Sequence, residues 1–149
     1  MLKAIKWAEK SVTKGGGPFG AVIVKNGEII AQGHNCVTLH NDPTAHAEVT
    51  TIRKACKKLN TFDLAGCEIY TSCEPCPMCL AAIYWARMDK IYYGCTKDDA
   101  KNIGFDDSFI YEQIDLKPED RSIPAKQILH DKAIVAFQKW EEKEDKIEY

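Results

Sequence analysis

His46-Ala47-Glu48 and Pro75-Cys76-Pro77-Met78-Cys79 are the two short stretches around which this chain is organised. One imidazole and two thiolates give three metal ligands, one fewer than a structural zinc site has, so the fourth tetrahedral position is open for a water. Glu48 stands outside this ligand set and can move the proton that such a water releases. A CxxC pair alone is also typical of a redox pair or of two core thiols. The upstream HxE and the flanking proline favour a catalytic zinc.

Length and composition indicate one globular domain over residues 1–149. The chain is 45% hydrophobic and 28% charged, which is ordinary for a globular protein. Lysines interrupt the apolar residues of the N-terminus, and no segment approaches a membrane-spanning length. We therefore expect a cytoplasmic protein without a membrane partner. Seven cysteines are an odd number, which favours reduced thiols and metal ligation over a disulfide framework.

The charge balance bears on possible partners. The net charge is −2, and residues 141–149 hold five acidic side chains against two lysines. Such a surface gains little from counterion release on a phosphate backbone. We therefore expect no nucleic-acid partner.

The first part of the chain predicts a helix followed by a hairpin. Apolar residues at helical spacing predict an amphipathic helix over residues 2–14. The glycine-rich run 15–20 lacks the Gly-Lys-Ser/Thr ending of a phosphate loop, so we interpret it as a turn. Asn26-Gly27 between residues 21–25 and 28–34 predicts a type I′ hairpin. Residues 35–42 are polar and predict a loop.

The two metal-binding stretches predict two helix N-termini. Asp42-Pro43-Thr44 is a favourable helix start, and the apolar stripe predicts a helix to about Leu59. His46 and Glu48 are two residues apart, so they can face one site only in the first turn, beside a cavity. A second helix is predicted from Pro75 to about Ala86, with both thiolates on one side of its first turn and stabilised by the helix dipole.

The remaining elements predict a mixed sheet with helices on both faces. Residues 68–72 and 90–94 predict two strands, which should be parallel because a helix connects them. A short helix is predicted at residues 98–102, and a charged helix containing residues 133–140 closes the chain. Between them, residues 104–111 place two adjacent acids among aromatic residues, which is unusual in a plain loop.

Taken together, these residues resemble the cytidine deaminase-like superfamily, and within it most closely the bacterial guanine deaminases. The zinc motifs identify only the superfamily, whereas the Phe-Asp-Asp-Ser-Phe run and the C-terminal tyrosine point to guanine. The resemblance implies a three-layer α/β/α fold with a mixed central sheet. It is carried by residues 16–25, 41–49, 70–79, 104–111 and Tyr149.

The resemblance also implies roles for individual residues. Zinc is bound by His46, Cys76 and Cys79; Glu48 shuttles protons; and Phe19, Asn35, Asp107 and Tyr149 surround the purine. In the implied reaction a zinc-bound hydroxide attacks C2 of guanine, and Glu48 protonates N3 and then the departing amine, which yields xanthine and ammonia. The implied enzyme is a hydrolase of guanine catabolism in purine metabolism, with the purine base and water as its substrates.

The substrate contacts and the assembly follow from the same resemblance. Asp107 is an acceptor for the N1–H and amino edge of guanine, Asn35 offers both a donor and an acceptor, and Phe19 forms an apolar wall. The family also implies a homodimer with its C-terminal segment exchanged, so that Tyr149 completes the site of the other subunit. The N-terminal helix is a few residues shorter, and the tail more acidic, than in that family.

Three alternatives share parts of this pattern. A tRNA-specific adenosine deaminase has the same zinc chemistry but needs basic residues near its C-terminus, where this chain is acidic. A cytosine or cytidine deaminase is less consistent with the Phe-Asp-Asp-Ser-Phe run. A zinc-stabilised binding module without turnover would not need Glu48 beside an open coordination position. Ammonia release from a panel of bases separates these alternatives.

Overall fold

The structure is a computed structural model that describes residues 1–148, and it falls into two compact units, Met1–Asp107 and Ser108–Tyr149. Tyr149, which the sequence assigns to the purine site, lies outside the described residues. The single domain expected over residues 1–149 stays a prediction.

A four-stranded mixed sheet forms the centre of the first unit. Its strands are β1 (Gly20–Lys25), β2 (Glu28–His34), β3 (Cys67–Cys73) and β4 (Lys90–Cys95). The strand order is β2-β1-β3-β4, in which β1 is antiparallel to both neighbours and β3 is parallel to β4. Asn26 and Gly27 both have positive φ angles, as the predicted hairpin turn requires. The predicted mixed sheet is therefore confirmed.

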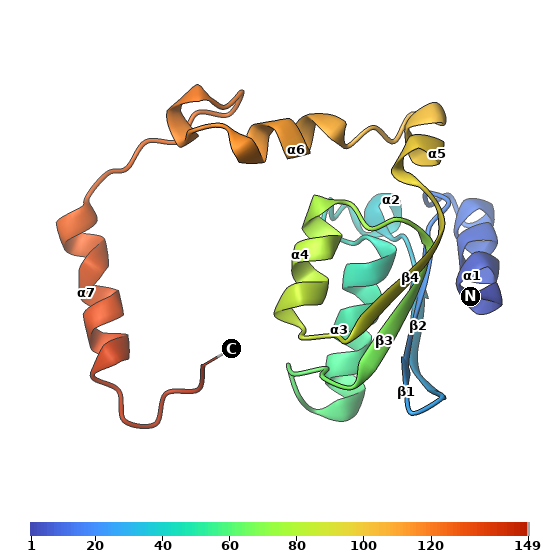
Figure 1. Cartoon of the computed structure of the whole chain (residues 1–149), viewed down its shortest axis with the longest axis horizontal. Coiled ribbons are helices and arrows are strands. Elements are labelled where there is room, and N and C mark those ends of the chain that lie inside the picture. The colour runs from blue at the N-terminus through green and yellow to red at the C-terminus, as the bar shows by residue number, and fades with distance from the viewer. Residues whose placement is uncertain (149) are drawn as a thin grey trace. The chain divides into compact units, whose positions relative to one another are not determined.

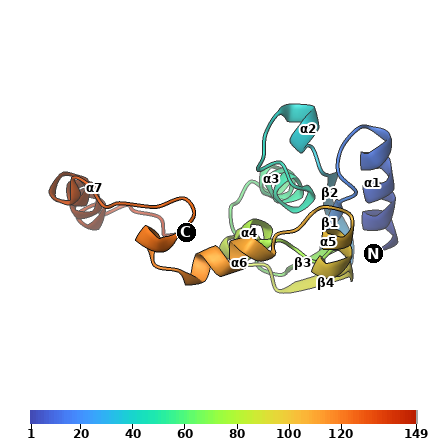
Figure 2. The ribbon, with the colours of Figure 1, turned by 90° about the horizontal axis from the view of Figure 1, so that it is seen from above.

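Helices cover both faces of this sheet. Helix α1 (Leu2–Thr13) packs on one face, and α3 (Ala47–Leu59) and α4 (Pro77–Trp85) lie on the other (Figures 1 and 2). The core between the sheet and α3 and α4 includes Ile23, Ile69 and Ile83, which are almost fully buried. The expected three-layer α/β/α architecture is confirmed.

Helix α3 begins at Ala47, whereas we had predicted a start at Pro43 with Asp42 as the cap. The Asp42 carboxylate accepts hydrogen bonds from the backbone N–H and the hydroxyl of Thr44, so it stabilises a separate turn instead of capping the helix. His46 is extended, with φ −63° and ψ 159°, and is the N-cap of α3. The sequence thus predicted the helix correctly and placed its start four residues too early.

Helix α4 begins at Pro77 and not at Pro75. Cys76 is its N-cap, with ψ at 167°. The reason is steric: a residue that precedes a proline is disfavoured in the helical region, so Pro77 keeps Cys76 extended and itself occupies the first helical position. Pro75 therefore lies before the helix.

Two short helices border the site. Residues 35–42, predicted as a loop, contain the one-turn helix α2 (Val37–His40). Helix α5 (Lys97–Asn102) is one residue longer than predicted, because Thr96 and Asp99 form a capping box at its start. Both helices are exposed or half-buried and supply walls of the site described below.

The second unit has no buried core of its own. It contains α6 (Ser108–Asp115), which we had not predicted, a 3₁₀ turn (Pro118–Asp120) and α7 (His130–Glu141). No residue from 108 to 148 is buried, and its large exposed apolar side chains are Phe109, Ile114, Leu116, Ile123, Ile128, Leu129, Val135, Phe137, Trp140 and Ile147. Across residues 1–148, no helix combines the length and apolar character needed to cross a membrane.

Candidate active site

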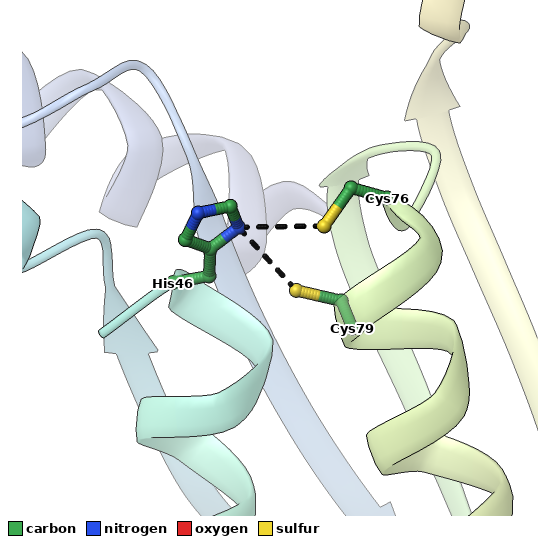
Figure 3. A group of neighbouring side chains, drawn as sticks. All are labelled: His46, Cys76 and Cys79. Carbon is green, nitrogen blue, oxygen red and sulfur yellow. Dashed lines mark hydrogen bonds between the residues drawn. The ribbon is translucent and has the colours of Figure 1, made fainter. Parts of the chain in front are cut away.

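Two helix N-termini meet at one place in the first unit. His46 is the N-cap of α3 with Glu48 in the first turn, and Cys76 is the N-cap of α4 with Cys79 three residues further on. The placement of His46 and Glu48 at the first turn is the one that the sequence required. The side chains of His46, Cys76 and Cys79 point toward one another (Figure 3). Because helix N-termini carry partial positive charge, both helices favour thiolates there.

The distances among these three side chains fit a tetrahedral zinc ion. His46 Nδ1 lies 3.5 Å from Cys76 Sγ and 3.5 Å from Cys79 Sγ. All three ligand atoms lie within 4.8 Å of one another. Zinc bonds of usual length to nitrogen and sulfur, at the tetrahedral angle, place N and S about 3.6 Å apart. The nitrogen and both sulfurs are therefore already spaced as zinc ligands.

The pKa values of the three side chains are shifted in different directions. The pKa of Cys76 is lowered to about 4, mainly because Cys79 donates a hydrogen bond to its thiolate and also because His46 lies beside it. The pKa of Cys79 is raised by the same hydrogen bond and by burial, and the pKa of His46 is raised by its hydrogen bond with Cys76. Without a metal the cysteine pair holds one negative charge, and a divalent cation between the two sulfurs favours the second thiolate.

Glu48 is a buried carboxyl group that faces the ligand set. It is 6% exposed, and Cys79 Sγ donates a hydrogen bond to its Oε2 at 3.3 Å. Its pKa is raised, with burial as the largest cause. A carboxyl group whose pKa is moved toward neutrality both accepts and releases protons under ordinary conditions. Glu48 is thus suited to proton transfer.

A cavity of about 460 Å³ opens over these residues. Among its walls are Phe19, Asn35 and Asp107, the three described residues that the resemblance assigned to the purine. All of its walls belong to the first unit. The remaining lining residues are Gly17, Val37, Thr38, Pro43, His46, Glu48, Cys73, Glu74, Cys76, Lys97, Ala100, Gly104, Phe105 and Asp106.

Phe105 is a wall residue that the sequence reasoning missed. Its ring packs edge-on against Phe19, with centroids 5.0 Å apart and an interplanar angle of 86°. Such a pair forms a continuous apolar surface on one side of the cavity. The sequence did contain a signal for it, because Phe105 begins the Phe-Asp-Asp-Ser-Phe run. From that run only Asp107 had been predicted to contact the purine.

Asp107 follows Phe105 in the same loop and is half-buried. Its pKa is raised, first by burial and then by the negative charge of Cys76. Its neighbour Asp106 forms an ion pair with Lys101 at 3.0 Å. Of these two adjacent acids, Asp107 is the one whose carboxylate loses solvation at the cavity.

The side-chain oxygen of Asn35 is hydrogen-bonded within the protein. Its Oδ1 accepts hydrogen bonds from the backbone N–H groups of Gly17, at 3.4 Å, and Val37, at 3.2 Å. An amide oxygen has two acceptor sites, so both are occupied. The sequence predicted that Asn35 offers the purine both a donor and an acceptor; this stays a prediction, and these two contacts favour the donor.

Known proteins resemble this chain over its whole length. The model of the cytidine and deoxycytidylate deaminase zinc-binding region matches residues 1–95. The guanine deaminase of Bacillus subtilis (strain 168) is 55% identical over 150 residues, which cover 100% of this chain and 96% of that protein. The X-ray structure of guanine deaminase from B. subtilis superposes with a TM-score of 0.96 at 55% identity and covers 99% of this chain and 95% of the other.

A second group of relatives matches part of the chain. The tRNA-specific adenosine deaminase of Aquifex aeolicus (strain VF5) is 48% identical over 90 residues, which cover 60% of each chain. This match shows the shared deaminase scaffold, whereas the full-length match to guanine deaminase extends beyond the residues of the family model.

Proposed function

Because the chain belongs to the cytidine and deoxycytidylate deaminase zinc-binding family, we propose that it is a zinc-dependent hydrolase that deaminates guanine to xanthine and ammonia. The observation that carries the proposal is the 55% identity to a guanine deaminase over the full chain. Identity confined to residues 1–95 would support the deaminase chemistry without the purine. The match continues through the segment that contains Asp107.

His46, Cys76 and Cys79 are the residues that would hold the zinc, as their mutual distances support. When bound, zinc supplies Lewis-acid chemistry that lowers the pKa of a water molecule toward neutrality. The chain would contribute three ligands and leave one for a water, and two of the three, His46 and Cys76, line the cavity.

Glu48 carries the proton transfers in this proposal. Its carboxylate accepts the proton that the attacking water loses and delivers it to N3 of guanine as C2 is attacked. It then takes the second proton from the hydroxyl group now on C2 and passes it to the amine, so the C2–N bond breaks, the C2 carbonyl forms, and ammonia and xanthine result. The burial of Glu48 supports this role, because it raises the pKa of the carboxyl group.

The cavity walls orient the base. Asp107 accepts hydrogen bonds from N1–H and the 2-amino group of guanine, and Asn35 donates through its amide nitrogen. Phe19 and Phe105 form the apolar wall against the flat face of the purine. Adenine has no N1–H and no 2-amino group, so Asp107 would face a lone pair and would disfavour it.

A homodimer with exchanged C-terminal segments belongs to the same proposal. The second unit exposes many apolar side chains and buries none within residues 108–148, so it needs a covering surface. Helix α4 exposes Tyr84 and Trp85, at 74% and 66%, which suits a partner surface. Tyr149 of one copy would then close the site of the other. The cytoplasmic location predicted from the sequence stays a prediction.

Ammonia release tests the proposed function. Purified zinc-replete protein is assayed with guanine, adenine, cytosine, cytidine and a tRNA anticodon stem-loop. We expect guanine to be deaminated fastest. The tRNA-specific adenosine deaminases, which are 48% identical over part of the chain in one case, are the second candidate. Faster conversion of adenosine in the stem-loop would overturn the guanine assignment in their favour.

A further inference from the structure

Asn35 is held by hydrogen bonds on every side except the one that faces the cavity. Its backbone N–H donates to Phe19 O at 3.0 Å, and its side-chain oxygen accepts from Gly17 N and Val37 N. Its backbone carbonyl accepts from Ser11 Oγ at 3.2 Å and lies 2.8 Å from His34 Nδ1. Five hydrogen bonds therefore fix both adjoining peptide planes and the side-chain amide.

These contacts determine which end of the amide meets a ligand. Backbone N–H groups donate and cannot pair with an NH₂ group, so the atom between Gly17 and Val37 is the oxygen. Within the described residues, no buried side-chain nitrogen or oxygen lacks a partner. The hydrogen bonds of Asn35 within the described residues use its backbone and its side-chain oxygen, and the residue lines the cavity, so we infer that its side-chain N–H donors are the groups left for a ligand.

Two residues outside the cavity, Ser11 and His34, hydrogen-bond to the backbone carbonyl of Asn35. Ser11 lies on α1, is 0% exposed and has no surface in the cavity. The space around this contact is full, because a Cβ at Gly16 would lie 2.6 Å from Ser11 Oγ and 2.7 Å from Asn35 O. A side chain at position 16 would therefore displace this contact.

His34 holds the same carbonyl from the end of β2. A carbonyl oxygen only accepts, so Nδ1 carries the proton in this contact. The imidazole is stacked on Trp7 of α1, with centroids 5.5 Å apart and an interplanar angle of 22°. The orientation of the His34 ring is thus set by α1, the same helix that carries Ser11.

We propose that Ser11 and His34 are positioning residues that fix the Asn35 amide as a preorganised hydrogen-bond donor to the substrate. This inference rests on the proposed function in one respect: the substrate is a base with an acceptor beside Asn35. Helix α1, which packs on the sheet face away from α3 and α4 (Figure 1), then serves the site without touching it. A donor already held in its reactive geometry loses little further freedom when substrate binds.

The test is a double-mutant cycle on kcat/KM. Ser11→Ala removes the hydroxyl and leaves the Asn35 carbonyl with His34 alone, so we expect a loss of about 3- to 10-fold, the size of one hydrogen bond. Ser11→Cys keeps a weak donor and should fall between Ser11→Ala and wild type. Thr13→Ala is the matched control, because it removes an exposed α1 hydroxyl that donates to Lys10 O, and it should leave kcat/KM unchanged.

The second arm of the cycle uses Asn35→Asp. This change keeps an oxygen for Gly17 and Val37 and replaces the two N–H donors with an acceptor. If Ser11 acts through Asn35, then Ser11→Ala has no further effect in the Asn35→Asp background. An equal loss in both backgrounds would overturn the inference, since it would reflect general destabilisation. Zinc content and melting temperature are measured for each variant.

A further variant guards against a failure of Ser11→Ala to fold. His34→Phe keeps an aromatic ring on Trp7 and removes the N–H, and we expect the same loss and the same dependence on Asn35. The cycle is measured on whichever base the wild type deaminates fastest. Failure of the wild type on guanine would refute the proposed function, whereas additive losses on the preferred base would refute the positioning role.

Discussion

Asp107→Asn is the perturbation that most directly tests the recognition of guanine. Guanine offers two neighbouring donors, N1–H and the 2-amino group, and a carboxylate accepts both. An asparagine accepts one and turns its own NH₂ toward the other. A donor left unpaired in a buried site costs about 1–3 kcal/mol. Because Asp107 is only half-buried, we expect about 1–2 kcal/mol, or about a 5- to 30-fold loss in kcat/KM for guanine.

The assay follows ammonia release with guanine for wild type and Asp107→Asn, each with its zinc content measured. Asp98→Asn is the control, because Asp98 is an exposed residue of α5 that does not line the cavity, and its kcat/KM should stay within about 2-fold of wild type. Unchanged guanine kinetics in a zinc-replete Asp107→Asn protein would remove Asp107 from substrate recognition.

The stability of Asp107→Asn should also depend on pH differently from that of the wild type. The pKa of Asp107 is raised above 3.8 in the folded state, mainly by burial. The contribution of this carboxyl group to the free energy of unfolding is therefore fully present below its unfolded pKa and is lost as the pH rises through its folded pKa. Asparagine removes that loss, so Asp107→Asn should be at least as stable as wild type at pH 7. Thermal melts at pH 4 and pH 7 measure the difference, and a lower melting temperature of the variant at pH 7 only would contradict it.

Three further outcomes are expected. Cys76→Ala should lose the zinc, which elemental analysis should find at one ion per wild-type chain, and full retention in the variant would exclude Cys76 as a ligand. Glu48→Gln should keep the metal and lose roughly 10²–10⁴ in turnover, because the amide is nearly isosteric but carries no transferable proton, and wild-type rates would exclude Glu48. Deletion of Tyr149 should depress guanine turnover at an unchanged melting temperature, and unaltered kinetics would argue against its role as a lid.

The zinc-binding stretches and the sheet could be predicted from the sequence because their signals are local. Asn26-Gly27 specifies its own turn. His46 and the two cysteines can be recognised as metal ligands from their own short motifs, whatever their separation in sequence, because each motif lies at a helix start. Both starts were placed too early. In α4 the rule that a residue before proline avoids the helix would have given Cys76 as the N-cap.

The parts that could not be predicted depend on contacts between distant segments. Nothing near Asn35 in the sequence shows that Gly17 donates to its oxygen or that Ser11, 24 residues earlier, holds its carbonyl. The pairing of Phe19 with Phe105 joins residues from opposite ends of the first unit. A residue type suggests which hydrogen bonds a side chain can make, and the fold decides which of them remain for a ligand.

The proposed chemistry lies within residues 1–95, together with two of the four proposed purine contacts, Phe19 and Asn35. The proposed zinc ligands and Glu48 fall within residues 1–95, which match the deaminase family, whereas Asp107 and Tyr149 lie beyond them. The first turns of α3 and α4 contain the fully buried residues Ala47 and Cys79, so changes there disturb folding and zinc binding together. Residues 108–148 include no buried side chain, so sequence changes there cost little stability within one chain. We therefore expect substitutions from Asp107 onward to alter substrate preference while zinc content stays the same.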